Sequence, residues 1–265
     1  MTAPRVYRTE AIIIKRSKLG EADRVLTLYT PDLGKLKAVA KGARRPVSKL
    51  GGHVELLTHS SLMLARGRNL DIITQGQTIN SFMPLKSELW RISCGFYVSE
   101  LVDSFTAERI ENPHLFGLLL DTLHRLCQVD DSERVLRYFE LHLLGHLGYR
   151  PQMQQCVSCG SSLRPLVNFF SPEEGGVLCP ECAVEGSRVY PLSLNSLKVM
   201  RLWQDCDYAQ AGRVKISTEL AAELRRVTRG YIEYLLEREV KSAAWLDRLK
   251  WEILKSESPI DNSCG

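Results

Sequence analysis

The hydrophobic pattern of this chain changes its period near Pro84, and this change limits the fold more than any other feature. Before it, five short runs rich in β-branched and apolar residues alternate with turn-prone pieces such as "PDLG" and "GARRPVSKLGGH". Five strands with no helix between them predict a small antiparallel barrel over residues 1–82. Five is the strand count of an OB-fold, and an SH3-like barrel has the same count. The runs are "YRTEAIII", "RVLTLYT", "KLKAVAK", "ELLTHSSLMLA" and "LDIITQGQT".

Beyond Pro84 the apolar spacing becomes helical. "SELWRISCGFYVSELVDSFT" carries an apolar stripe with Ser87 as a candidate N-cap, and four further segments repeat this spacing. We expect a helical domain over 83–150 and 188–255, interrupted by an insertion at 151–187, and a disordered tail at 256–265. The fold class is then α+β and multidomain. The four segments are "NPHLFGLLLDTLHRLCQV", "SERVLRYFELHLLGHLGY", "SLNSLKVMRLWQDC" and "STELAAELRRVTRGYIEYLLERE".

Four of the eight cysteines form a metal-binding pattern. Cys156 and Cys159 make one C-x2-C pair, and after a gap of 19 residues Cys179 and Cys182 make a second. Two such pairs at this spacing are typical of a zinc ribbon, with "LVNFF" as a strand and "PEEGG" as a turn between them. A disulfide framework is the weaker interpretation in a cytoplasmic chain, where thiols stay reduced. Four thiolates close the tetrahedron, so we expect one structural Zn2+. Cys94, Cys127, Cys206 and Cys264 share no spacing.

A catalytic alternative rests on one letter match. His53 and Glu55 fit the H-x-E half of a zinc deaminase signature, with "CPEC" as the other half. That signature needs a proline before its first cysteine, whereas Pro180 follows Cys179, and the two halves lie in segments of different periodicity. A zinc-dependent hydrolase or deaminase acting on nucleic acid therefore remains only an alternative, as does an RNA-binding zinc-ribbon scaffold.

Positive charge is concentrated in the first part of the chain. Residues 1–80 hold 14 Lys and Arg against 6 Asp and Glu, while the rest holds 21 against 25. In "KLKAVAK" strand alternation puts Lys35, Lys37 and Lys41 on one face, and the turn-like piece after it carries Arg44, Arg45 and Lys49. A solvated basic face is the alternative, but a strand followed by a basic loop favours a nucleic-acid phosphate site.

Aromatic side chains for base stacking are scarce in the same region. Tyr7 and Tyr29 are the only Phe, Tyr or Trp residues among the first 80. Single-strand binding that tolerates any sequence often adds such stacking to phosphate contacts. The pattern therefore indicates that nucleic acid would be bound through its phosphate charges. No run of about 18 apolar residues is present for a membrane span, and no phosphate-binding G-x4-G-K-[ST] motif occurs, so we expect a cytoplasmic protein without nucleotide hydrolysis.

Several separated pieces resemble one family. "GEADRVLTLYTPDLGKLKAVAKGARRPVSKLGG", "GRNLDIITQ", "LLGHLGYRPQMQQCVSCG" and "FFSPEEGGVLCPEC" are similar to the bacterial recombination mediators of the RecO family, from about Tyr7 to the helix after Thr218. The resemblance implies an OB-fold, a helical domain and a zinc-binding insertion. It also implies a non-enzymatic protein that binds single- and double-stranded DNA and anneals complementary strands in RecF-pathway repair, close to the nucleoid.

The resemblance also implies residues and partners. By position the DNA contacts are Lys35, Lys37, Lys41, Arg44 and Arg45, with Lys49 beside them, and the metal ligands are the four paired cysteines. The implied partners are RecR and the acidic C-terminal tail of single-stranded DNA-binding protein, with which the family loads RecA. That tail needs an apolar pocket with a basic rim in the helical domain, for which Arg125, Arg134 and Arg137 are candidates. Where many relatives have an aromatic after "GG", this chain has "HVELLTHSS", which argues against stacking there.

Overall fold

Five strands close into a barrel at the N-terminal end of the computed structural model, which describes residues 5–184, 186 and 188–257. The strand order around the barrel is β1-β2-β3-β5-β4, which confirms the five predicted strands. The expectation of purely antiparallel pairing is wrong at one place, because β3 and β5 pair in parallel over three residues. The strands are β1 (Val6–Leu19), β2 (Asp23–Thr30), β3 (Gly34–Ala40), β4 (His59–Ala65) and β5 (Asp71–Asn80), with a short 3-10 helix η1 (Gly51–Val54) before β4.

Both faces of the barrel wall are buried along the middle of β1. Ala11 and Ile13 point into the barrel, where they pack with apolar side chains of the other strands. Ile12 and Ile14 point outward, yet they belong to the core cluster of the helical body. A half-buried strand alternates apolar and polar residues, so the run "AIII" marks the place where helices cover the barrel.

The helices form a body beside the barrel, and all predicted helical segments are confirmed. They are α1 (Met83–Lys86), α2 (Leu89–Phe105), α3 (Pro113–Gln128), α4 (Ser132–His146), α5 (Leu194–Asp205), α6 (Tyr208–Ala211), α7 (Thr218–Leu236) and α8 (Lys241–Glu257). Ser87 does not cap α2 as predicted. It ends α1 instead, with its hydroxyl donating to the Pro84 carbonyl at 2.9 Å, and Glu88 takes the N-cap position of α2.

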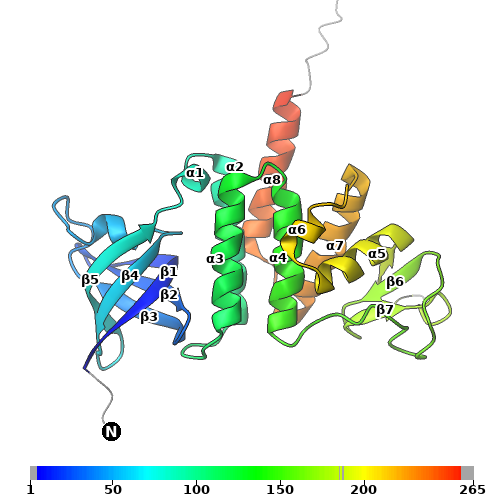
Figure 1. Ribbon diagram of the computed structural model, residues 1–265, viewed down its shortest axis with the longest axis horizontal. Helices are drawn as coiled ribbons and strands as arrows, with labels where there is room; N and C mark the ends of the chain where they lie inside the picture. Colours follow the sequence, from blue (N-terminus) through cyan, green and yellow to red (C-terminus); the bar gives the residue numbers. More distant parts are fainter. Residues whose placement is uncertain (1–4, 185, 187, 258–265) are drawn as a thin grey trace, which may run out of the picture.

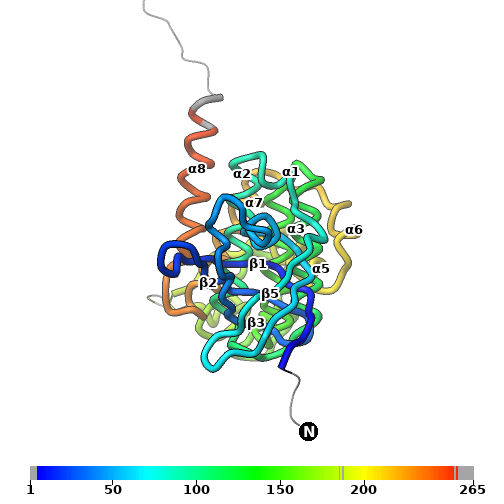
Figure 2. The backbone as a smooth tube through the Cα atoms, turned by 90° about the vertical axis from the view of Figure 1, so that its left-hand side faces the viewer, coloured from blue at the N-terminus to red at the C-terminus, as the bar shows by residue number. Residues whose placement is uncertain are grey.

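The C-terminal helix α8 was not among the predicted helical segments, and it stands out from the body. In Figures 1 and 2 it is the red helix that projects beyond the other helices. Residues 256–257 of the predicted tail belong to α8, and residues 258–265 lie outside the described residues. Its start is capped from another element, because the backbone N–H of Ser242 donates to Glu100 of α2 at 2.8 Å.

The barrel and the cysteine region lie at opposite ends of the molecule, with the helices between them (Figure 1). The predicted hairpin of the insertion is confirmed as β6 (Asn168–Ser171) and β7 (Gly176–Leu178), joined through the turn after Ser171. A third strand, β8 (Tyr190–Leu192), pairs with β6. Phe170 of β6 packs edge-on against Tyr231 of α7, with ring centroids 5.3 Å apart, so the small sheet is seated on the helical body.

The segment between α2 and α3 ties the helical body to the barrel. The backbone N–H of Arg109 donates to the Lys35 carbonyl at 2.7 Å, and the Arg109 guanidinium reaches Asp71 of β5 at 3.0 Å. Gly34 sits directly under this segment with a φ of +61°, and a Cβ there would lie 1.8 Å from the Ile110 carbonyl oxygen. Only glycine fits such a position. The segment therefore lies against the start of β3 and holds the helical body to the barrel there.

Candidate nucleic-acid interface and cysteine cluster

The lysines at the start of β3 face the helical body. Lys35 is only 9% exposed, and its Nζ donates to the backbone carbonyl of Asp103 at 2.5 Å and lies 3.3 Å from the Asp103 carboxylate. Lys37 pairs with Glu108 at 2.5 Å, and this hydrogen bond raises the pKa of Lys37. The interpretation of three lysines projecting from one free face is therefore wrong for Lys35, because α2 covers the strand there.

The basic loop after β3 is exposed and ordered. Its backbone is fixed to the β1–β2 turn, since Arg44 N–H donates to the Ala22 carbonyl at 3.0 Å and Gly42 N–H donates to the Asp23 carboxylate at 2.7 Å. Ala43 between them is buried in the barrel core. The backbone of the loop is therefore held in one position, and the charged side chains project from fixed points. Its exposed cations are Lys41, Arg44, Arg45 and Lys49.

Three further cations, which strand patterns alone did not single out, join this loop. Arg16 and Lys18 at the end of β1 and Arg24 at the start of β2 line a concavity of about 220 Å3 together with Ser17 and Arg44. The pairing register of β1 with β2 brings these side chains beside the loop, and the sequence does not reveal that register. We call this set the hairpin cluster. It consists of Arg16, Lys18, Arg24, Lys41, Arg44, Arg45 and Lys49.

One carboxylate holds part of the hairpin cluster in place. Glu55 accepts hydrogen bonds from Arg16 and, at 2.8 Å, from Arg24. Burial raises the pKa of Glu55, but the hydrogen bond from Arg24 and the charge of Arg16 outweigh it and lower that pKa. Arg44 donates to the Gly20 carbonyl at 3.0 Å. A carbonyl carries no net charge, so this hydrogen bond does not neutralise the Arg44 guanidinium. Positive charge is therefore in excess around the concavity.

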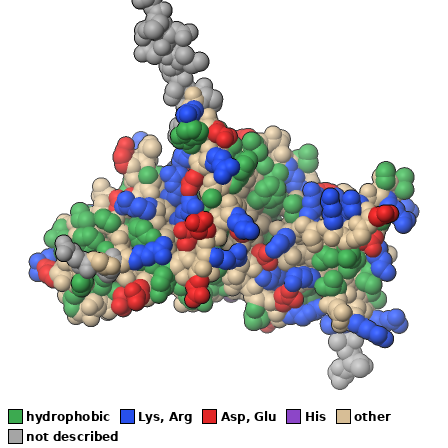
Figure 3. All heavy atoms as spheres, turned by 180° about the vertical axis from the view of Figure 1, so that it is seen from behind, with side chains coloured by type: hydrophobic (Ala, Val, Ile, Leu, Met, Phe, Trp, Pro, Cys, Tyr) green, Lys and Arg blue, Asp and Glu red, His purple; other side chains and the backbone are tan. Residues whose placement is uncertain are grey.

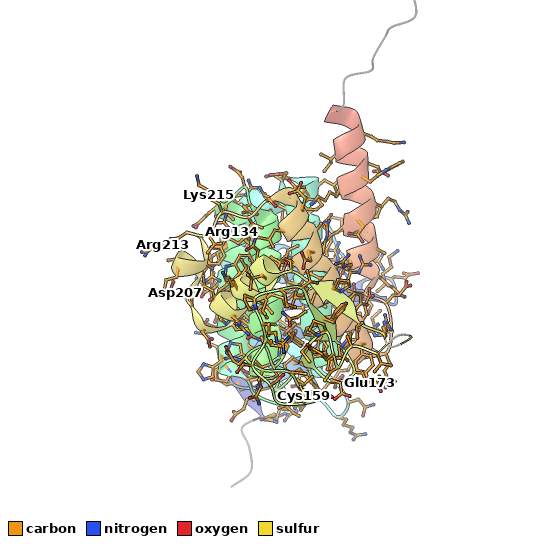
Figure 4. The ribbon with its side chains drawn as sticks, turned by 90° about the vertical axis from the view of Figure 1, so that its right-hand side faces the viewer. Arg134, Cys159, Glu173, Asp207, Arg213 and Lys215 are labelled. Carbon is orange, nitrogen blue, oxygen red and sulfur yellow. The ribbon has the colours of Figure 1, made fainter. Side chains whose placement is uncertain are left out.

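The four paired cysteines meet at one point. Their Sγ atoms all lie within 4.8 Å of one another, and Cys159 Sγ is 3.8 Å from Cys179 Sγ. A tetrahedral ion with Zn–S bonds of about 2.3 Å requires sulfur atoms about 3.8 Å apart. The donor set and its spacing therefore fit a four-coordinate metal ion. Figure 4 labels Cys159 in this region.

Local hydrogen bonds prepare these thiols as ligands. Gly160 N–H donates to the Cys156 carbonyl at 2.9 Å with a φ of +72° at Gly160, which closes the first knuckle. The Ser161 hydroxyl lowers the pKa of Cys159 to about 6. Cys179 N–H points at Cys156 Sγ at 3.4 Å. Both knuckles thus turn sulfur toward a common centre, as predicted from spacing.

The other three cysteines among the described residues belong to no group of metal-ligand geometry. Cys94 and Cys206 are buried and Cys127 is partly buried, and burial raises the pKa of Cys94 to about 12. Cys264 lies outside the described residues.

The deaminase alternative loses its geometric basis, because η1 with His53 belongs to the barrel while the cysteines lie at the other end of the molecule (Figure 1). Within the described residues, no helix combines the length and the apolar character needed to cross a bilayer.

A groove of about 930 Å3 opens between α4, α7 and α8. Arg137 lies at its floor with a side chain only 5% exposed, and its Nε and Nη1 have no partner among the described residues. Trp251 of α8 forms one wall and is 57% exposed. Of the three candidate arginines for a tail pocket, Arg134 and Arg137 line this groove, whereas Arg125 stacks on Tyr208 with its guanidinium 4.3 Å from the ring centroid.

Comparison with known proteins gives two family models that together cover most of the chain. The model described as "Recombination protein O N terminal" matches residues 1–82, and "Recombination protein O C terminal" matches residues 86–244. Most of α8 therefore lies beyond the second match.

Individual relatives agree with these models. A protein of Dehalococcoides mccartyi named "DNA repair protein RecO" is 43% identical over 249 residues, which is 94% of this chain and 98% of the relative. A protein of the same name from a Roseiflexus species is 46% identical over 255 residues, or 96% of this chain and 89% of the relative. One from Desulforamulus reducens is 36% identical over 245 residues, or 92% and 95%.

The cysteine geometry predicts about one bound metal ion per chain. Cys182→Ala should abolish metal retention and weaken the β6–β8 region by several kcal/mol, because ligand binding contributes directly to the stability of such sites. Elemental analysis and limited proteolysis measure both effects. Cys127→Ala is the matched control and should keep the ion. Full metal retention in Cys182→Ala would rule out the four-thiolate site.

Proposed function

This chain belongs to the RecO family, and from that premise we propose that it is a non-catalytic DNA-binding protein that anneals complementary strands during recombinational DNA repair. The observation that carries the proposal is the hairpin cluster, in which four cations line one concavity and three more are exposed on the adjoining loop. Arginine forks suit phosphate oxygens and lysine adds adaptable point charge. Bringing two strands together requires that their mutual repulsion be neutralised, and such a cluster supplies the charge.

The barrel supports this function as an OB-fold. Its five strands, closed in the order β1-β2-β3-β5-β4, suit that assignment. OB-folds bind oligonucleotides on the face of strands 2 and 3 and through the loops after β1 and after β4; here α2 covers Lys35 on that face, which leaves the loops. The hairpin cluster includes the end of β1 and the start of β2. We propose that residues 1–82 act as the DNA-binding domain, 83–150 and 188–255 as a helical domain, and 151–187 as the zinc-binding insertion.

Recognition through phosphates explains why base stacking is dispensable. Tyr29 is fully buried against the helical body, and the Tyr7 hydroxyl donates to Asp71 at 2.5 Å. Neither ring is therefore presented as a platform for bases. The bound strands keep their base edges open for pairing, so the partner strand supplies the sequence specificity.

Lys35 and Lys37 contribute to this function indirectly. Both were candidate DNA contacts, but their ammonium groups pair with Asp103 and Glu108. We propose that they orient the barrel on the helical body, while Lys41, Arg44, Arg45 and Lys49 contact phosphates. Lys37 has a side chain 48% exposed, so it remains within reach of a phosphate at the rim.

Zinc is the ion we propose for the cysteine cluster. Four thiolates at tetrahedral spacing suit Zn2+ and leave no open position for water. The ion would hold the knuckles together and support the β6–β8 sheet against α7. Its role is structural, so we assign no enzymatic step to it.

The groove between α4, α7 and α8 is our candidate for the acidic C-terminal tail of single-stranded DNA-binding protein. A terminal carboxylate would meet the buried Arg137 guanidinium, and apolar side chains of the tail would pack on Trp251. Arg226 and Lys250 at the rim suit acidic residues of the tail. From the family we further propose RecR as a partner, loading of RecA, and a place of action at the nucleoid.

The DNA-binding proposal predicts a charge-specific loss. Lys41→Ala/Arg44→Ala should weaken binding of single-stranded DNA about tenfold at low salt, and should reduce the slope of log K against log salt by about 1.4, because each lost phosphate contact removes about 0.7. Fluorescence anisotropy over a salt series measures both, and a structured RNA competitor tests the RNA-binding alternative.

A matched control comes from the far side of the molecule. Arg213→Ala/Lys215→Ala removes one Arg and one Lys that are exposed near α6 and α7 (Figure 4). This variant should bind DNA like the wild type. Equal affinities and equal salt slopes for the two double variants would refute the hairpin cluster as the phosphate site.

The groove predicts binding of a short acidic peptide that ends in an apolar residue with a free carboxylate. Trp251→Ala should weaken the peptide at least about fivefold, because exposed aromatic anchors carry much of such affinity, and amidation of the peptide terminus should abolish binding. Trp245→Ala is the control on the same helix, since Trp245 donates to Ser93 of α2 at 3.1 Å. Calorimetry that finds Trp251→Ala equal to the wild type would exclude the groove.

A further inference from the structure

Three large apolar side chains lie exposed on one face of the helical body. Leu89 and Phe96 are seven residues apart on α2, so they share one face of that helix, and they are 59% and 38% exposed. Trp245 of α8 lies beside them, because its indole N–H donates to Ser93 of α2 at 3.1 Å, and it is 45% exposed. Figure 3 shows hydrophobic side chains gathered between α8 and the barrel. We call Leu89, Phe96 and Trp245 the apolar patch.

The charged side chains of α2 do not solvate this face, because all three are engaged in other contacts. Arg91 pairs with Asp130 at 3.0 Å. Glu100 accepts from the start of α8, and Asp103 accepts from Lys15 at 2.9 Å. Apolar residues occur on every side of α2, which is typical of a helix with no face turned to solvent. The outer face of α2 therefore has the composition of a contact surface.

Helix α8 extends the apolar patch with a row of charged side chains. Four exposed residues follow one another at spacings of four, three and four, so they lie in one row along the helix. They are Lys241, Trp245, Arg248 and Glu252. The ion pairs that hold α8 to the body use Asp247 and Lys250 instead. The charges of the row are therefore available to a partner.

This row is complementary to itself. Residues 241 and 252 are centred on the same point of α8 as residues 245 and 248. When two copies of α8 lie antiparallel about that point, Lys241 of each copy therefore faces Glu252 of the other. The Arg248 guanidinium of each copy faces the Trp245 ring of the other, and such cation–π contacts are attractive. Every contact occurs twice, as an interface about a two-fold axis requires. The charge pattern thus favours a second copy of this chain as the partner.

From the row and the apolar patch we infer that two copies of this chain associate through α8, antiparallel about a two-fold axis, and bury the apolar patch between them. The hydrogen bond to Ser93 already holds Trp245 in place, so little side-chain freedom is lost on association. The 17 residues of α8 span about 25 Å. A contact of this length is small for a stable dimer, which buries about 1,200–2,000 Å2, so we expect association in the micromolar range.

The dimer has a consequence for strand annealing, and this part of the inference rests on the proposed function. Each copy brings one hairpin cluster, so a dimer holds two DNA strands at once. Two strands on one assembly meet at the high effective concentration of an intramolecular encounter. Dimer formation would therefore accelerate annealing without any change in the affinity of each chain for DNA.

Charge reversal tests the pairing directly. In analytical ultracentrifugation across the micromolar range, the full-length wild type should pass from monomer to dimer. Lys241→Glu should weaken the dimer at least about tenfold, because it places like charges opposite each other in both symmetry-related pairs. Glu252→Lys should do the same, and the double variant Lys241→Glu/Glu252→Lys should restore the dimer. Lys215→Glu is the matched control, since Lys215 is exposed outside α2 and α8, and it should dimerise like the wild type.

DNA measurements on the same variants separate the inference from the proposed function. Lys241→Glu should bind single-stranded DNA like the wild type but anneal complementary strands at least about fivefold more slowly, because fewer chains are paired. The double variant should recover the wild-type rate. A wild type that stays monomeric across the series, or a double variant no more dimeric than Lys241→Glu, would overturn the inference and leave DNA binding intact. A wild type that dimerises but binds no DNA would overturn the proposed function alone.

Discussion

The contact between β3 and the segment after α2 determines how the rest of the molecule is arranged. Lys35 is inserted between the strand and Asp103, and Arg109 reaches across to the buried Asp71. Buried charges of this kind are costly unless they are paired, and here every charge has its partner. The junction fixes the barrel against α2 and covers part of the outer face of β2 and β3, where Thr27, Tyr29 and Lys35 are buried. It thereby favours the loops at the ends of the barrel over the β2–β3 face as the surface for a polyanion.

The barrel and the helical body differ in how their charges are distributed. The barrel carries excess cations at its exposed ends, while the groove beside α8 mixes cations with four carboxylates, which are Asp131, Glu133, Glu233 and Asp247. Those carboxylates are paired with arginines and a lysine of the groove, so no continuous row of unpaired cations is left for a nucleic-acid backbone. A single terminal carboxylate needs one guanidinium, for which we propose Arg137. Charge pattern therefore favours nucleic acid at the barrel and a peptide at the helices.

Much of this architecture is predictable from local patterns. Five strand-like runs, the helical stripes and the hairpin between the cysteine pairs follow from period and spacing, because these features depend on neighbours in the chain. Spacing also predicted that the four paired cysteines would meet at one point, since two C-x2-C pairs have few other uses. Alternation in "KLKAVAK" placed Lys35 and Lys37 correctly on one face. It did not say what covers that face, because Asp103 and Glu108 lie far away in the sequence.

Other features depend on distant contacts and escape a local pattern. Helix α8 gains its N-cap from Glu100 of α2, and Arg16 and Lys18 come near the loop after β3 only through the pairing of β1 with β2 and of β2 with β3. Neither contact can be predicted from the residues that flank these positions in the sequence.

The central claim is that DNA binds at the ends of the barrel and not across its β2–β3 face. Amide hydrogen exchange with and without single-stranded DNA tests this most directly, because it reports every segment at once. The account predicts slower exchange in segments 18–24, 41–52 and 66–70, with no change in 27–35. Strong protection of 27–35 by DNA, with the other three segments unchanged, would contradict it.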